Sequence, residues 1–198
     1  MSKFLGPIHY ILYERICFLS AWNEVYCHAL NKKQNFPFHT IPLENHIDEG
    51  NIHESLQGMI LYVQQEHGSL VQEFVEQFGR DKILDVLEPF AKTNIMDGNI
   101  QDIVKQYQAR FLHGMPCDRN LVIEMLEDNH AHIYLHYDSQ VPYFRDASLW
   151  IWEREQLINK MLPEMFVYEE KEDGGHLYQK SINQTWRDML EEEKHQNR

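Results

Sequence analysis

Histidines gathered in one short segment are the residues of this sequence best suited to bind a metal ion. His130, His132 and His136 are separated by even numbers of positions, so on a β-strand they share one face. At about 3.4 Å per residue the first two lie roughly 7 Å apart, which is close enough to hold one ion. With Glu124 as a third ligand, the sequence predicts a metal site of His130, His132 and Glu124. The alternative is a solvated polar face that holds no ion.

This site depends on how two neighbouring strands pair. Apolar and polar residues alternate over 121–126 and again over 132–137, which is typical of a β-hairpin. A three-residue loop over 128–130 keeps the apolar residues of both strands on one face, and that face decides the register. In this register Glu124 lies opposite Tyr134 and diagonal to the neighbouring histidines.

A second set of candidate ligands lies in the first 120 residues. His9, Tyr13 and Cys17 recur at every fourth position and therefore share one face of the expected first helix. We expect His9, Tyr13, His53 and Cys117 to contact a small organic ligand, a transition metal or haem. In the alternative interpretation, the histidines only form hydrogen bonds within or beside the helices.

The loop around Cys117 offers a different chemistry. Cys117 follows an expected helix and lies two residues before Arg119, whose charge would stabilise a thiolate, and His113 would serve as the base. On this rival hypothesis the chain is a metal- or thiol-dependent enzyme that acts on a small molecule, with Cys117 and His113 as the catalytic candidates. In the alternative, Cys117 is a small apolar residue in the core.

Motifs of several large enzyme classes are missing. The sequence contains no Gly-x-Gly-x-x-Gly, no Gly-Lys-Ser/Thr loop, no Gly-x-Ser-x-Gly, no His-Glu-x-x-His and no Cys-x-x-Cys. Dinucleotide oxidoreductases, P-loop NTPases, serine hydrolases and zincin proteases are therefore disfavoured. The leading hypothesis is a binding or sensing protein for a small molecule, metal or haem. A third hypothesis is a protein interaction module with Trp150 and Trp152 at its interface.

The periodicity of apolar residues predicts an α+β fold, in which an N-terminal helical bundle packs on a C-terminal part with antiparallel hairpins and a helix between them. Helices are expected over 6–30, 48–78, 80–92, 99–113, 146–162 and 184–194, with a second hairpin over 165–182. Asp48 is the expected N-cap of the long second helix. The expected domains are a helical part, 1–118, and an α+β part, 119–198, and one continuous domain remains an open alternative.

Composition limits the partners of this chain. Its 198 residues include 18 Lys and Arg against 31 Asp and Glu, a formal net charge of −13, which argues against nucleic-acid binding. No run of 18 apolar residues is present, so no membrane span is expected. Three irregularly spaced cysteines fit a reducing cytoplasm. We therefore expect a cytoplasmic protein with a small-molecule or metal ligand, without nucleic-acid or membrane partners, and with homo-oligomerisation left open.

Three stretches of the first 120 residues share a pattern with known sequences. They are Gly-Pro-Ile-His-Tyr-Ile-Leu-Tyr-Glu-Arg-Ile over 6–16, Asn-Ile-His over 51–53 and Gly-Met-Pro-Cys-Asp over 114–118. These stretches resemble the signature stretches of an uncharacterised bacterial family. The resemblance implies no activity, but it marks His9, His53 and Cys117 as residues to test together.

Overall fold

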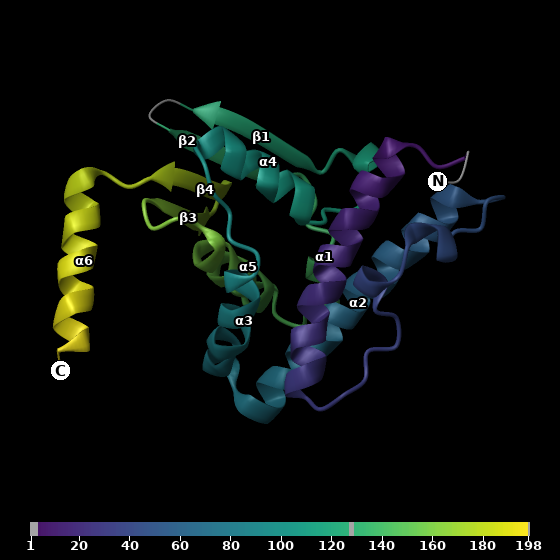
Figure 1. Cartoon of the computed structure of the whole chain (residues 1–198), viewed down its shortest axis with the longest axis horizontal. Helices are drawn as coiled ribbons and strands as arrows, with labels where there is room; N and C mark the ends of the chain where they lie inside the picture. The colour runs from purple at the N-terminus through teal and green to yellow at the C-terminus, as the bar shows by residue number, and fades with distance from the viewer. Residues whose placement is uncertain (1–3, 127–128, 198) are drawn as a thin grey trace.

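Helices pack against a four-stranded antiparallel sheet, and the predicted α+β class, with a helix between two hairpins, is confirmed (Figure 1). The computed structural model describes residues 4–126 and 129–197. The helices are α1 (Pro7–Ala29), α2 (Ile52–Phe78), α3 (Ile83–Lys92), α4 (Ile100–Arg110), α5 (Ala147–Met161) and α6 (Ile182–Gln196). The strands are β1 (Leu121–Leu126), β2 (His130–Leu135), β3 (Phe166–Lys171) and β4 (Gly174–Gln179).

The ends of α2 follow from its capping residues. Asn51 is the N-cap, because its side-chain oxygen accepts a hydrogen bond from the N–H of Glu54. The prediction of Asp48 as the N-cap is therefore wrong, and the helix starts at residue 52 rather than near 48. Asp48 instead accepts a hydrogen bond from the N–H of Gly50 in the preceding turn. At the other end Gly79 adopts a φ of 88°, which an L side chain rarely adopts, and the helix stops as predicted.

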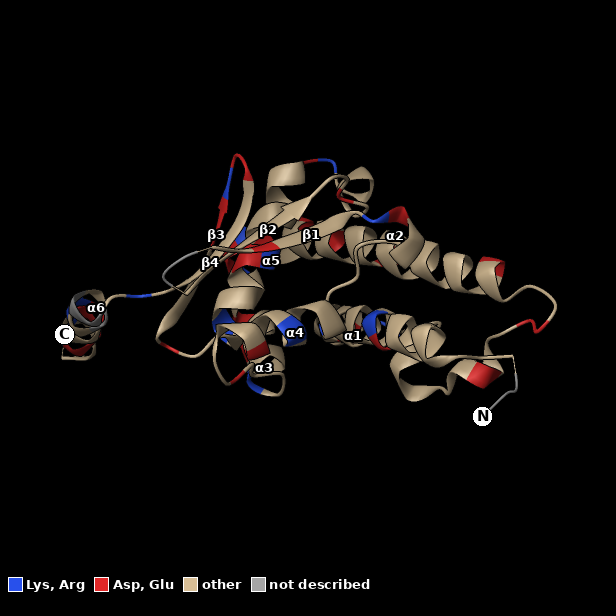
Figure 2. Ribbon diagram, turned by 90° about the horizontal axis from the view of Figure 1, so that it is seen from above, with Lys and Arg blue, Asp and Glu red and all other residues tan. Residues whose placement is uncertain are grey.

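The buried apolar side chains form one cluster that extends from the helices to the sheet. Helices α1 and α2 lie side by side, and α5 completes the core between them and the strands (Figures 1 and 2). Trp22 of α1 and Trp150 of α5 pack with their ring centroids 5.7 Å apart. Trp150 is only 4% exposed, whereas Trp152 is half-buried under the guanidinium of Arg80. Trp150 therefore belongs to the core and is not available as a surface for a partner.

A chain of buried hydrogen bonds links helices α1, α2 and α5. His67 of α2 and Glu153 of α5 are both 0% exposed, and His67 Nε2 lies 2.8 Å from Glu153 Oε1. His67 Nδ1 contacts the side-chain oxygen of Asn23 at 2.6 Å, and Tyr26 donates a hydrogen bond to the other oxygen of Glu153. Because every member is buried, loss of any one would leave its partners unsatisfied.

Strand order in the sheet is β1-β2-β4-β3, so the two hairpins join through β2 and β4. Helices α4 and α5 lie over one face of the sheet (Figure 1). Apolar residues such as Ala131, Ile133 and Leu177 point to this covered face and are buried. The alternate residues point to the open face, because side chains alternate along a strand.

The first hairpin corrects the predicted register. Leu126 pairs with His130 and Glu124 pairs with His132, so the pairing is shifted by two positions from the prediction. Of the predicted loop residues 128–130, Asp128 lies outside the described residues, and His130 belongs to β2. An even shift preserves the faces, so the expectation that the apolar residues of both strands share one face is confirmed.

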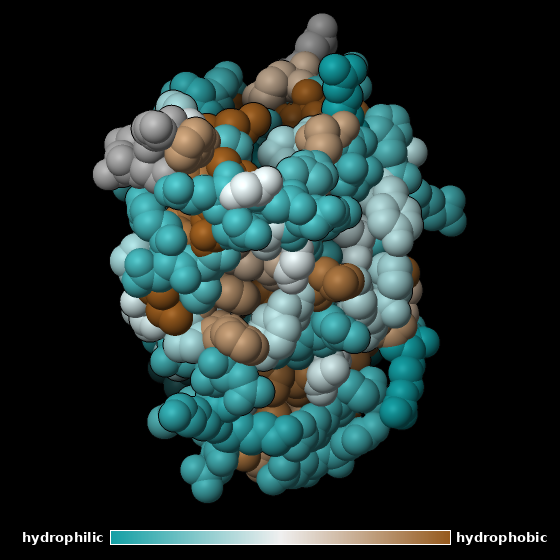
Figure 3. Space-filling model, turned by 90° about the vertical axis from the view of Figure 1, so that its right-hand side faces the viewer, coloured by the Kyte–Doolittle hydropathy of each residue, from teal (hydrophilic) through white to brown (hydrophobic). Residues whose placement is uncertain are grey.

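The C-terminal helix α6 stands apart from the main body, beyond the β3–β4 hairpin (Figures 1 and 2). An ion pair between Lys180 and Asp188, at 2.8 Å, links it to the end of β4. Trp186, Met189 and Leu190 of this helix are exposed. At the opposite end of the molecule the surface is mostly hydrophilic, with separate apolar patches (Figure 3). Among the described residues, no helix is both long and apolar enough to cross a membrane.

Candidate functional site

A row of four polar side chains crosses the open face of the sheet, with one residue from each strand. In strand order the row reads Glu124, His132, His176 and Glu169, because each is the direct cross-strand partner of the next. Directly opposite residues in antiparallel strands lie about 4.5–5.5 Å apart at their Cβ atoms. Two imidazoles are therefore adjacent in the middle of the sheet, with a carboxylate on either side.

The turn between β3 and β4 adds a third potential metal ligand. His132, Asp173 and His176 each offer one ligand atom, and these three atoms all lie within 4.8 Å of one another. His176 Nε2 lies 2.7 Å from Asp173 Oδ1, and His132 Nε2 lies 3.8 Å from Asp173 Oδ2. The two imidazole rings are stacked, with centroids 4.6 Å apart. This arrangement brings two nitrogens and a carboxylate oxygen to one point on the surface.

Hydrogen bonds orient these side chains. His132 Nε2 donates to the backbone carbonyl of Asp173 at 2.7 Å, and His130 Nε2 lies 2.8 Å from His176 Nδ1. The hydrogen bond from His176 lowers the pKa of the Asp173 carboxyl group. Burial, followed by the neighbouring positive charge of His176 when it is protonated, lowers the pKa of His130. His176 is thus held between an acidic partner and a second imidazole.

The predicted metal site and this cluster overlap at one residue. His132 belongs to both, whereas His130 contacts the other nitrogen of His176, and Glu124 is exposed on the neighbouring strand. Within the described part of the chain, neither His130 nor Glu124 belongs to a group of three close ligand atoms. His130 and Glu124 therefore lie beside the cluster, whose members are His132, Asp173 and His176.

The other predicted ligands lie in the helical part. Tyr13 is buried, and its hydroxyl donates to the backbone carbonyl of Phe38 at 2.8 Å, while Cys17 lies 3.5 Å from the same carbonyl oxygen. His9 accepts a hydrogen bond from the N–H of Gly6 at the start of α1. These side chains are therefore engaged with the backbone around the N-terminal half of α1.

The remaining candidates differ in their exposure to solvent. His53 is exposed in the first turn of α2, and Cys117 is exposed in a short 3-10 turn over 116–118. His113 is buried, because α4 ends at Arg110 instead of continuing to residue 113 as predicted, and the chain turns inwards there. No hydrogen bond between Cys117 and His113 is found among the described residues, so the proposed thiol–imidazole pair stays a prediction without geometric support.

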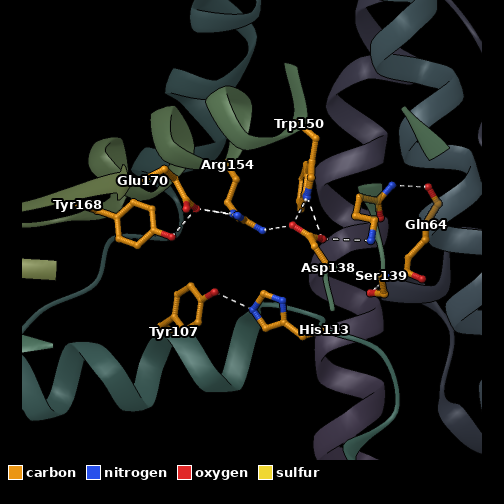
Figure 4. Close-up of polar contacts among 10 residues, drawn as sticks. Gln64, Tyr107, His113, Asp138, Ser139, Trp150, Arg154, Tyr168 and Glu170 are labelled. Carbon is orange, nitrogen blue, oxygen red and sulfur yellow. Dashed lines mark hydrogen bonds and ion pairs between the residues drawn. The ribbon is translucent and has the colours of Figure 1, made fainter. Parts of the chain in front are cut away.

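Arg154 of α5 is the centre of a second polar cluster, on the covered side of the sheet (Figure 4). Its side chain is 5% exposed, and Nε and Nη2 donate to Glu170 Oε1 at 2.9 and 2.6 Å. Nη1 donates to Asp138 Oδ2 at 2.7 Å. Trp150 donates its indole N–H to Asp138, and the Tyr168 hydroxyl donates to Glu170. Each carboxylate therefore accepts hydrogen bonds from both the Arg154 cation and a neutral donor.

A tyrosine–histidine pair lies beside this ion cluster (Figure 4). The Tyr107 hydroxyl and His113 Nε2 are 2.6 Å apart. Burial, followed by the positive charge of Arg154, lowers the pKa of His113 to about 3. Burial also raises the pKa of Tyr107 and Tyr168. At neutral pH the imidazole and both phenols are therefore uncharged, and the charge of the cluster is that of its arginine and carboxylates.

Asp173, His176 and the whole Arg154 cluster are not predicted from the sequence. His132 and Asp173 are 41 positions apart, and the pairing of β2 with β4 that joins them is not encoded in any local pattern. A signal for the second cluster was present: at helical spacing, Glu153 and Arg154 lie on the same stripe as Trp150, Leu157 and Ile158. Charges at such positions are rarely buried unless they are paired.

Comparison with known proteins assigns neither a family nor a function to this chain. No family model, no curated protein and no solved structure matches this chain. The resemblance of the 6–16, 51–53 and 114–118 stretches to a bacterial family therefore stays a prediction.

Proposed function

We propose that this chain is a cytoplasmic protein that binds or senses a divalent transition-metal ion through His132, Asp173 and His176. The observation that supports the proposal is the convergence of three ligand atoms within 4.8 Å of one another. These ligands come from the middle of the sheet and from the turn that follows β3, so the sheet itself sets their separation. The free thiols of all three cysteines support a reducing compartment.

The donor set favours one class of ion. Two imidazoles and one carboxylate suit Zn²⁺, Fe²⁺, Co²⁺ or Ni²⁺, whereas Mg²⁺ and Ca²⁺ prefer oxygen ligands alone. Structural zinc sites are normally closed by four protein ligands, but sites with three protein ligands keep a position for water or a small molecule. An ion held by His132, Asp173 and His176 would therefore remain accessible to a small exogenous ligand.

The proton positions of the cluster predict how binding proceeds. His132 Nε2 donates to the carbonyl of Asp173, and His176 Nε2 faces the Asp173 carboxylate, so both nitrogens carry protons in this arrangement. A metal ligand must be deprotonated, so binding displaces these protons. His130 is placed to support the change, because it contacts the Nδ1 atom of His176 that stays free of the ion.

Titration of untagged, chelator-treated protein with Zn²⁺ tests the proposal. We expect one high-affinity ion per chain, and Asp173→Asn should weaken its affinity by more than about 100-fold, beyond the loss typical of residues outside the ligand set. Glu124→Gln is the matched control, because Glu124 is also an exposed carboxylate and is the direct cross-strand partner of His132. It should change the affinity only a few-fold.

Two outcomes would overturn the proposal. Wild-type protein that takes up no stoichiometric Zn²⁺ would exclude the site altogether. Loss of binding in Glu124→Gln but not in Asp173→Asn would transfer the site to the originally predicted set of His130, His132 and Glu124. Circular dichroism of both variants, compared with wild type, shows whether the hairpins have kept their fold.

A further inference from the structure

A cleft with a volume of about 170 Å³ lies next to the Arg154 cluster, at the end of the sheet formed by the β3–β4 turn. It is separate from the metal cluster in its residues, although Gly174 and Gly175, which follow Asp173, form part of its wall. Arg154, Asp138 and Glu170 supply its charged groups, and Tyr107 and Tyr168 supply aromatic ones. No residue of this cleft takes part in the proposed metal site.

The charge of the cleft favours a cation. Arg154 contributes one positive charge against two negative charges from Asp138 and Glu170, a balance of 1 − 2 = −1. At the mouth, Lys171 and Glu172 cancel, so the balance is unchanged. An anion would have to compete for Arg154, whose Nε, Nη1 and Nη2 atoms already donate to the two carboxylates.

Glu170 also has an acceptor that the protein does not use. Its Oε1 atom accepts from Arg154 twice and from Tyr168 once, whereas Oε2 accepts no hydrogen bond from any described residue. The Glu170 side chain is only 11% exposed, but Oε2 is not among the buried polar atoms without a partner, so this oxygen is accessible from the cleft side of the surface. A carboxylate oxygen in that position would bind an N–H donor of a cation more strongly than a neutral donor.

The size and the lining of the cleft limit the rest of the ligand. A cavity of about 150 Å³ is known to accommodate benzene, so this cleft admits a molecule with about one ring. Ile133 and Leu135 add apolar surface beside Tyr107 and Tyr168, whose rings are buried. The Tyr107 ring is stacked on Phe111 and His113, so its face packs against the protein rather than a ligand. We propose that the cleft binds a small organic cation, an amine or amidine, whose charged group pairs with Glu170 and whose apolar body contacts the apolar side chains of the wall.

Four probes of similar size test the proposal by calorimetric titration of the full chain at neutral pH. Benzylamine and benzamidine are cationic, benzyl alcohol is neutral, and benzoate is anionic. We expect both cations to bind with millimolar or tighter affinity, at least about tenfold more tightly than benzyl alcohol, and benzoate not to bind. Binding of benzoate or benzyl alcohol as tightly as benzylamine, or no saturable binding of either cation, would overturn the proposal.

Variants of the cleft give a second, independent readout. Glu170→Gln retains an acceptor for Arg154 and Tyr168 but removes the negative charge, and it should weaken benzylamine binding by about tenfold or more. Glu169→Gln is the matched control, since Glu169 precedes Glu170 on β3, points to the open face and bonds to Tyr178 at 2.7 Å. It should bind benzylamine like wild type.

A third variant keeps the test decisive if Glu170→Gln does not fold. Leu135→Trp fills the cleft from a half-buried position at the end of β2 and leaves the ion pairs of Arg154 in place. It should abolish benzylamine binding while circular dichroism stays like that of wild type. Wild-type affinity in the folded Leu135→Trp variant would overturn the proposal. Zn²⁺ titration of Glu170→Gln and Leu135→Trp distinguishes this cleft from the metal site. Both variants should bind Zn²⁺ like wild type.

Discussion

The two faces of the sheet carry two polar clusters whose charged groups differ in burial. On the covered face, the side chains of Arg154, Asp138 and Glu170 are 5%, 16% and 11% exposed and are bonded to one another. On the open face, the side chains of His132 and His176 are 19% and 10% exposed, and the charged group, the carboxylate of Asp173, is 63% exposed. Two consecutive residues of β3 lie on different faces of the sheet: Glu169 points to the open face and Glu170 to the covered one.

Because of this difference in burial, we expect the covered-face cluster to contribute to stability and the open-face cluster to contribute to binding. A buried ion pair is expensive to desolvate, so removal of one partner leaves an uncompensated charge and destabilises the fold strongly. The exposed carboxylate of Asp173 is solvated with or without partners, so its contacts contribute little to stability and it remains available to an external ligand. We therefore expect substitutions on the covered face to change the free energy of unfolding, and substitutions on the open face to change metal affinity.

The largest effect is expected from Arg154→Met. The variant removes the cation and leaves the carboxylates of Asp138 and Glu170 buried without their charged partner. We expect the free energy of unfolding to fall by about 3–5 kcal/mol. Urea denaturation at neutral pH, followed by circular dichroism, measures this change.

Arg145→Met is the matched control for that prediction. Arg145 also pairs with a carboxylate, that of Glu76 at 3.4 Å, but its side chain is 79% exposed. Its removal should leave the urea midpoint nearly unchanged, because exposed ion pairs contribute little. Equal destabilisation by the two substitutions would refute the distinction between buried and exposed ion pairs.

An intermediate effect is expected at His130, which we interpret as a positioning residue. Its Nε2 atom contacts His176 Nδ1 at 2.8 Å and so fixes the orientation of the other ring nitrogen. His130→Phe should weaken Zn²⁺ affinity by about 10- to 100-fold, the range found for residues that support metal ligands. His130→Gln, which can still form a hydrogen bond, should recover part of the loss.

His136→Phe is the control for this second prediction. His136 follows β2, and its ring contacts that of Tyr134 rather than the histidine cluster. Its Zn²⁺ affinity should equal that of wild type, and the urea midpoints of all three variants should remain close together. A His130→Phe protein with wild-type affinity would show that His130 does not position His176.

Local patterns predicted most of the fold because they depend on neighbouring residues. The apolar stripe of α2 and the glycine at its end located the helix, although the choice of Asp48 as its cap was wrong since Asn51 makes the capping bond. The alternation of residues located both strands of the first hairpin and their shared face. It could not fix the register, because a shift by two positions preserves every face.

The sites depend on contacts between distant segments, which explains why they were only partly predicted. The histidine strand was recognisable, but its partners Asp173 and His176 come from the other hairpin and reach it only when β2 pairs with β4. For the covered face, the position of Arg154 on the apolar stripe of its helix indicated a buried charge. Nothing local indicated that its partners are Asp138, in the loop after β2, and Glu170, on β3.

The most gradual effect is expected in the pH dependence of stability. Burial and the charge of Arg154 lower the pKa of His113 from 6.5 to about 3, although Asp138 acts in the opposite direction and Arg15 in the same one. Below pH 6.5 the unfolded chain therefore takes up a proton that the folded chain refuses until about pH 3. The contribution of neutral His113 is fully present above pH 6.5 and is lost as the pH falls towards 3.

His113→Gln removes this titration but can still accept a hydrogen bond from Tyr107. Between about pH 6 and 4 the free energy of unfolding of wild type should fall by about 1.4 kcal/mol per pH unit more than that of His113→Gln. Urea denaturation at several pH values measures the two slopes, and His136→Gln, which replaces an exposed histidine, should keep the wild-type slope. Identical slopes for wild type and His113→Gln would mean that His113 accepts a proton in the folded state, and hence that the covered face is more open to water than its burial indicates.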